Sequence, residues 1–84
     1  MKATVKEIVN YHGTDYKDKL VEIHAVSADN VASLMKKIYS FERSSRYDSA
    51  RRYEIVEEDI KEKYQYWKQN GMTIEDFYGS ATVD

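Results

Sequence analysis

The chain has 84 residues, enough for one domain with a single hydrophobic core and too few for two. Its net charge of −2 and its lack of cysteine exclude a strongly basic phosphate-binding composition, a disulfide framework and thiolate chemistry. No apolar run has the length of a signal peptide or a membrane span, so we expect a cytoplasmic protein without a membrane partner.

The first predicted element is a strand over residues 3–11. The same letters also fit a short helix, because Thr4 and Glu7 form a capping-box pair and Gly13 could end it. We favour the strand because the polar segment 12–19 is typical of a turn leading to a second strand. In the strand, Val5, Val9 and Tyr11 alternate with Lys6, Ile8 and Asn10.

The second strand is predicted over residues 20–26. Its alternation places Val21, Ile23 and Ala25 on one face. Leu20 and Val26 fall on the opposite face, which indicates that this strand is covered on both sides, at least in part.

An amphipathic helix is predicted from Asp29 to Phe41, because Ser27, Asp29 and Asn30 are residues that favour a helix start. We expect the helix to end where the segment FERSS begins, and a polar loop to run to about Ala50. One apolar stripe at helical spacing should be buried against the sheet. It consists of Val31, Leu34, Met35, Ile38 and Phe41.

A third strand is predicted over residues 52–57, with Tyr53 and Ile55 on one face. Residues 58–70 are predicted as a second helix that ends at Gly71. Acids in its first turn and a lysine in its last turn suit the helix dipole. The residues expected on its buried face are Ile60, Tyr64 and Trp67.

Residues 73–78 are predicted as a short helical turn, capped by Thr73 and followed by Gly79, and residues 80–84 as a polar tail. The order β-β-α-β-α predicts one α+β domain over residues 1–79 with a three-stranded sheet. The second strand, the first helix and the third strand are expected to form a right-handed parallel crossover. The first strand would then lie at an edge of the sheet.

Every arginine of the chain lies within ten consecutive residues, inside a stretch (residues 36–52) of net charge +4 that is followed by one of net charge −5. Guanidinium groups pair bidentately with phosphate or carboxylate. The arginine segment is therefore a candidate surface for nucleic acid or an acidic protein, with Tyr53 as a further stacking ring. The alternative is a solvated loop in which Arg51 and Arg52 flank a strand and pair with Glu54 or Glu57. The candidate residues are Arg43, Arg46, Tyr47, Arg51 and Arg52.

Acidic residues gather after the arginine segment. An array of carboxylates can imitate phosphates and occupy the basic channel of an enzyme that handles nucleic acid; the alternative is a solvated helix face. The candidate residues of this acidic face are Glu54, Glu57, Glu58, Asp59 and Glu62, extended by Glu75 and Asp76.

Aromatic residues gather near the C-terminal end. Tyr66 lies about 200° around the predicted helix from Tyr64 and should point outward, away from the core. Tyrosine and tryptophan are preferred anchors of protein interfaces. The candidate aromatic patch is Tyr66, Phe77 and Tyr78, with core packing as the alternative.

The two histidines, His12 and His24, have neither cysteine nor a closely spaced carboxylate beside them in the sequence. No residue pattern supplies a nucleophile with its base, and the glycines stand singly rather than in a phosphate-binding loop. We therefore expect no metal site, no cofactor and no catalysis.

These features predict a small non-enzymatic protein-binding module whose partner is a larger protein. Abundant residues with AT-rich codons favour an origin in a phage or mobile element. The expected role is a regulator or inhibitor of a larger host enzyme that handles nucleic acid. The alternative is a nucleic-acid-binding accessory protein that uses the segment Arg43–Arg52, and self-association stays open.

Overall fold

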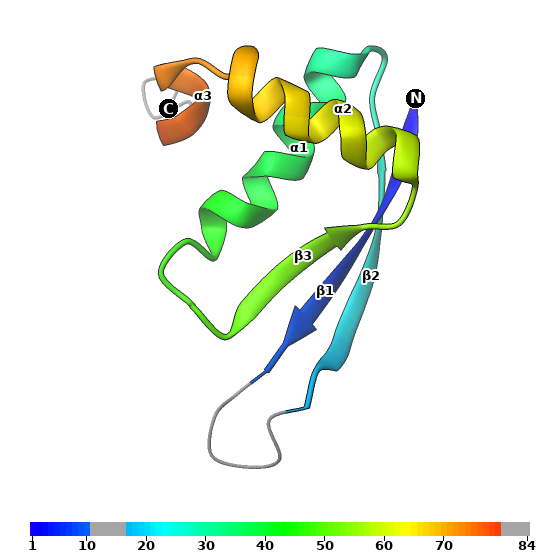
Figure 1. The fold of residues 1–84 in the computed structure, drawn as a ribbon, viewed down its shortest axis with the longest axis vertical. Coiled ribbons are helices and arrows are strands. Elements are labelled where there is room, and N and C mark those ends of the chain that lie inside the picture. Colours follow the sequence, from blue (N-terminus) through cyan, green and yellow to red (C-terminus); the bar gives the residue numbers. More distant parts are fainter. Residues whose placement is uncertain (11–16, 80–84) are drawn as a thin grey trace.

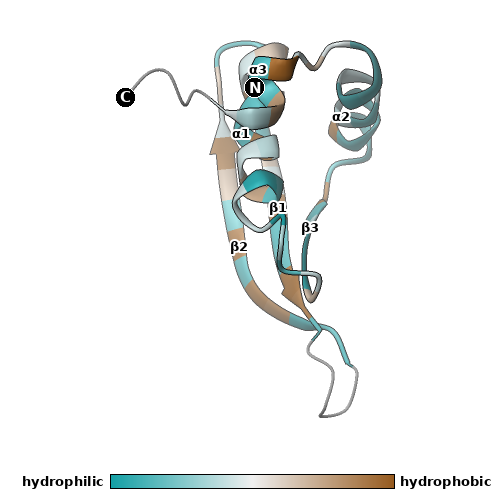
Figure 2. Ribbon diagram, turned by 90° about the vertical axis from the view of Figure 1, so that its left-hand side faces the viewer, coloured by the Kyte–Doolittle hydropathy of each residue, from teal (hydrophilic) through white to brown (hydrophobic). Residues whose placement is uncertain are grey.

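A computed structural model describes residues 1–10 and 17–79; His12, Gly13 and the predicted polar tail lie outside the described residues. The fold is α+β, as predicted, with a three-stranded antiparallel sheet and helices on one of its faces (Figures 1 and 2). The elements are β1 (Lys2–Val9), β2 (Lys19–Ser27), α1 (Val31–Ser44), β3 (Arg51–Ile55), α2 (Glu58–Asn70) and α3 (Ile74–Tyr78).

The first element is the predicted strand rather than the alternative helix, but its position was predicted wrongly. The strand order is β2-β1-β3, so β1 lies in the centre of the sheet and not at an edge. β1 pairs with β2 as a hairpin, and α1 then carries the chain across to the free side of β1, where β3 pairs. β2 and β3 thus run parallel, as the predicted crossover requires, but β1 separates them.

β2 is not covered on both faces, which corrects the sequence-based expectation. Its register against β1 changes so that Glu22 faces Glu7 while Leu20 faces Ile8, which leaves Val21 as an extra residue in a β-bulge. The bulge puts Leu20 and Val21 on the same outer face, and both are more than half exposed. The physical reason is that the helices form one layer and cover the other face alone.

α1 begins two residues later and ends three residues later than predicted, so Arg43 lies on the helix and not in a loop. Its N-cap is Asn30, whose side chain accepts a hydrogen bond from the backbone N–H of Ser33 at 2.8 Å. The buried stripe also differs. Val31, in the first turn, is 38% exposed. Tyr39 is buried instead, because its ring packs edge-on against Trp67 at 6.0 Å.

α2 has the predicted bounds and buries the predicted residues Ile60, Tyr64 and Trp67. Gly71 ends the helix, but its φ of −116° is not left-handed. Glycine fits there for a different reason, because a Cβ atom would lie 3.0 Å from Cδ1 of Trp67. Thr73 is the N-cap of α3, as predicted, and it forms a capping box with Asp76.

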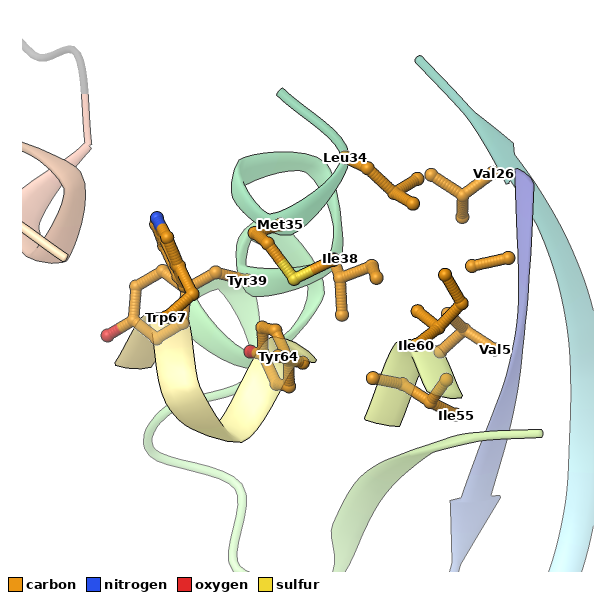
Figure 3. Close-up of a cluster of buried hydrophobic side chains, with 11 residues drawn as sticks. Val5, Val26, Leu34, Met35, Ile38, Tyr39, Ile55, Ile60, Tyr64 and Trp67 are labelled. Atoms are coloured by element: carbon orange, nitrogen blue, oxygen red, sulfur yellow. The ribbon is translucent and has the colours of Figure 1, made fainter. Parts of the chain in front are cut away.

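The hydrophobic core lies between the helix layer and the inner face of the sheet (Figure 3). α1 contributes Leu34, Met35 and Ile38, each no more than 1% exposed. β1 and β3 contribute Val5 and Ile55 from the sheet side. In the described part of the chain, no helix combines the length and apolar character needed to cross a membrane.

We expect Leu34→Ala to lower the free energy of unfolding by about 2–4 kcal/mol, because it leaves a cavity under α1. Chemical unfolding followed by circular dichroism would measure this loss. Val31→Ala on the same helix is the matched control and should cost less than about 1 kcal/mol, because Val31 is already partly in solvent. Equal losses for the two variants would contradict the placement of the core.

Candidate functional site

Two arginines of the arginine segment hold α3 against the end of α1. Arg46 donates hydrogen bonds to the backbone carbonyl of Phe77 at 2.7 Å and to the hydroxyl of Tyr39 at 3.3 Å. Its guanidinium carbon also lies 4.2 Å from the centre of the Phe77 ring. Arg43 donates to the carbonyl of Asp76 at 3.3 Å. Both side chains therefore serve to dock a short helix.

The other two arginines lie next to each other on β3 and point to opposite faces of the sheet. Arg51 forms an ion pair with Glu7 and another with Asp48 at 3.3 Å. Arg52 pairs with Asp18 at 2.7 Å and with Glu54 at 2.9 Å. The hydrogen bonds from Arg52 and then from Asn10 lower the pKa of Asp18 to about 2.

The structure does not bring the four guanidinium groups to one surface. Each has an acceptor within the protein, and a bound phosphate would have to compete with that acceptor or use the remaining N–H groups. Of the predicted residues in this segment, Tyr47 alone is almost fully in solvent, at 95% exposure. The described structure thus agrees with the alternative in which the arginines pair with groups of the protein itself.

A cluster that the sequence analysis did not single out lies on the inner face of the sheet. Nε2 of His24 lies 2.8 Å from Glu7, and its Nδ1 lies 3.2 Å from Glu22. The His24 ring packs on Phe41 at 4.6 Å. Hydrogen bonding from His24, followed by the charge of Arg51, lowers the pKa of Glu7.

These three side chains, Glu7, Glu22 and His24, bring their ligand atoms within 4.8 Å of one another, a separation that could suit a metal ion. Glu7 is already neutralised by Arg51, however, and a cation would be repelled by that guanidinium. The arrangement is suited to joining β1, β2 and β3 across the sheet. The sequence signal for it was the spacing of Glu22 and His24, which are two residues apart and therefore on one face of a strand, but the strand that brings Glu7 to them was unknown.

The predicted acidic face divides into structural and exposed carboxylates. Glu57 accepts hydrogen bonds from the backbone N–H and the hydroxyl of Thr4 at 2.8 and 2.9 Å, which lower its pKa. Glu54 is paired with Arg52. Three exposed acids remain on the first turns of α2, and these are Glu58, Asp59 and Glu62.

The predicted aromatic residues lie in solvent to different extents. Tyr66 is 70% exposed and Tyr78 is 67% exposed, while Phe77 is 38% exposed because Arg46 and Tyr39 cover part of its ring. Tyr66 points outward from α2, as the helical geometry predicted. It lies on a different helix from Phe77 and Tyr78, whose rings pack on each other at 5.0 Å.

Tyr66 borders a groove of about 560 Å³ between the first turn of α1 and α2. The floor is apolar and the rim carries one acid and one lysine. The lining residues are Val31, Ala32, Glu62, Lys63, Tyr66, Trp67 and Gly71. The α1 side of this groove could not be recognised in the sequence, because the helical pattern assigns Val31 to the core.

A second hollow of about 350 Å³ lies between α1 and α3 and is lined largely by polar groups. Lys36 pairs there with Asp76 at 3.6 Å, and Arg43 donates to the backbone of the same residue. Gly79 closes the hollow with a left-handed φ of 84°, and a Cβ atom there would lie 2.9 Å from Nε of Arg43. The charges are mutually compensated, so this hollow serves α3 docking.

Comparison with protein-family models, with curated proteins and with solved structures found no match to this chain. The function of the candidate site is therefore inferred from its geometry alone.

We expect Arg46→Ala to detach α3 locally while leaving the sheet intact. The change removes the bond to the Phe77 carbonyl and the contact with its ring, which should ease opening of α3 by about 1–3 kcal/mol. Amide hydrogen exchange of residues 74–78 would measure it. Arg52→Ala, which removes an exposed guanidinium on the opposite sheet face, should leave that exchange unchanged.

We expect stability to fall in acid as Glu7 is protonated. Its pKa lies below the ordinary value of 4.5, so ionised Glu7 stabilises the fold above that pH, and the stabilisation is lost as the pH falls through the folded-state pKa. Glu7→Gln should therefore cost about 1–3 kcal/mol at neutral pH and progressively less as the pH falls from 4.5 through the folded-state pKa. Urea unfolding across this range would test it, with Glu62→Gln on exposed α2 as the control. An equal cost across this range would contradict this role of Glu7.

Proposed function

We propose that the chain is a small non-enzymatic protein-binding module that contacts a larger protein through the groove beside Tyr66. The observation that carries this proposal is the combination of an apolar groove floor and a tyrosine that is 70% exposed at its edge. Tyrosine supplies a large contact area with few rotatable bonds, and hot spots form where such rings fill or border pockets.

The rim of the groove adds polar groups that can orient a partner. Glu62 and Lys63 are consecutive residues of α2 with opposite charges. A polar rim around an apolar centre is the usual anatomy of a protein interface. Glu58 and Asp59 extend the negative charge along the same helix.

The narrower proposal is a regulator or inhibitor of a larger enzyme that handles nucleic acid, encoded by a phage or mobile element. It is supported by the exposed acids Glu58, Asp59 and Glu62, which would face a basic channel of such an enzyme. Identification of the bound partner would test this narrower proposal.

The nucleic-acid alternative has weaker support from the contacts. Arg43 and Arg46 dock α3, while Arg51 and Arg52 are held by carboxylates of the protein itself. Phosphate contacts at these residues would have to compete with those bonds or use the remaining N–H groups. A titration at physiological salt that showed micromolar binding to random duplex or single-stranded nucleic acid would favour this alternative over ours.

We expect Tyr66→Ala to leave the free energy of unfolding within about 0.5 kcal/mol of the wild type but to weaken partner binding by about 2 kcal/mol or more. The partner would be captured from the native host with tagged protein, after nuclease treatment, and its affinity then measured with purified components. Tyr47→Ala is the matched control, because this tyrosine is 95% exposed but lies on the loop after α1. A partner that binds both variants as tightly as the wild type would exclude the Tyr66 groove.

A further inference from the structure

A group of exposed aliphatic side chains of the described chain lies on an edge strand. β2 is the longest strand, at 9 residues, and it pairs with β1 on one side only. Its outer face carries Leu20, Val21 and Ile23, each 53–56% exposed. Figures 1 and 2 show β2 at the border of the sheet, on the side away from β3. A long edge strand with apolar side chains is a template for pairing with another strand.

The exposed apolar side chains lie along the β2 edge, and they do not extend over the whole outer face of the sheet. Across the three strands, Ile23 lies opposite Lys6 of β1, and Lys6 lies opposite Glu54 of β3. A second sheet stacked on this face would bury those two charged groups. The opposite edge strand, β3, has 5 residues and is accompanied by Lys61, Tyr64 and Gln65 of α2. β2 is therefore the edge suited to strand addition.

The hydrogen-bond pattern shows which backbone groups of β2 are available. The N–H of Ala28 donates to Met1 at 2.9 Å, and the Met1 nitrogen donates to Ala28 at 2.7 Å, so this is a hydrogen-bonded pair. Because such pairs alternate along an antiparallel ladder, His24 is directed at β1 and Ile23 and Ala25 are directed outward. The Ser27 carbonyl accepts a hydrogen bond from Nζ of Lys37 at 2.7 Å, which marks one end of the open edge. The bulge at Val21 marks the other.

We propose that two copies of this chain pair antiparallel through their β2 strands, with Ile23 of both copies at the two-fold axis, to form one continuous six-stranded sheet. In this register the outward-directed groups of Ile23 meet those of Ile23 in the second copy. On the outer face, Val21 of each copy comes beside Ala25 of the other. The apolar side chains thus cover one another across the axis.

Charge selects this register over its neighbours. With Ile23 at the axis, Glu22 lies opposite His24 of the second copy, in a non-hydrogen-bonded pair, where side chains approach most closely. A shift that places Glu22 at the axis would set two glutamates directly opposite each other. A shift that places His24 at the axis would set two histidines opposite each other and leave both glutamates against Val26. Of these three registers, the one with Ile23 at the axis is therefore the self-complementary one.

This interface is the β2 edge of the sheet, whereas α1 and α2 form the Tyr66 groove, so the inference does not rest on the proposed function. An edge pairing buries less area than a standard stable interface, and the dimer should accordingly depend on protein concentration.

Sedimentation velocity over a concentration series tests the proposal on the whole chain. The wild type should show a reversible monomer–dimer equilibrium, and Ile23→Glu should weaken dimerisation about tenfold or more by setting two carboxylates opposite each other. Ile74→Glu is the matched control, because Ile74 is 78% exposed but lies on α3, and it should dimerise like the wild type. A wild type that stays monomeric at several hundred micromolar would overturn the proposal and leave the edge to a strand of another protein. A dimer that Ile23→Glu does not weaken would overturn it as well.

Disulfide crosslinking tests the register independently of whether Ile23→Glu folds. The chain has no cysteine, so a single Ile23→Cys supplies the sole thiol. Directly opposed hydrogen-bonded residues are about 5.5 Å apart at Cα, within reach of a disulfide, so mild oxidation should give a covalent dimer. Ala25→Cys places its copies about 13 Å apart in the same register and should stay monomeric. Crosslinking of Ala25→Cys as efficient as that of Ile23→Cys would overturn the register.

Discussion

The packing of α1 across the inner face of the sheet is the interaction on which the rest of this structure depends. Leu34, Met35 and Ile38 are almost completely buried between α1 and the strands. Because α1 connects β2 to β3, its position decides that the two strands flank β1. Its C-terminal turns carry Arg43 and, just beyond them, Arg46, which hold α3 in place. One helix therefore organises both the sheet order and the docking of the last element.

Because the helices form a single layer, one face of the sheet stays exposed to solvent. The inner face of the sheet is covered and the outer face is not, so apolar residues on β2 remain in solvent. On the helix side, α1 and α2 diverge enough to leave the groove beside Tyr66. The proposed dimer surface is the β2 edge and the groove lies between α1 and α2, so the two surfaces share no residue and a partner and a second copy could bind at the same time.

The arginine segment illustrates why charge clusters in a sequence are weak evidence for a ligand. The four guanidinium groups are adjacent along the chain, yet a helix end, a loop and a strand direct them to different places. Arg51 and Arg52 are consecutive residues of β3 and therefore point to opposite faces of the sheet. Carboxylates distant in sequence, Glu7 and Asp18, reach them there. Arginine suits this role because its planar fork bonds several acceptors at once.

Local chemistry determined a large part of the fold. The bounds of α2, its buried face and the capping box of α3 depend on residues a few positions apart, and the sequence predicted them correctly. The outward direction of Tyr66 followed from helical geometry in the same way. These features are readable because helix periodicity and capping act within one or two turns.

Tertiary structure decided what depends on contacts between distant segments. The central position of β1, the bulge at Val21 and the exposure of Val31 each follow from which elements meet across the sheet. The pairing of Arg52 with Glu54 was predicted, because the two residues are near in sequence, but the distant acceptors Asp18 and Glu7 and the cluster of Glu7 with His24 were not. Ion pairing joins Arg51 to Glu7, 44 positions away, and strand pairing joins residues as distant as Val5 and Ile55, and no local pattern specifies such a partner. The sequence thus identified the candidate binding residues by type, but the packing around them determined which of them are exposed to a partner.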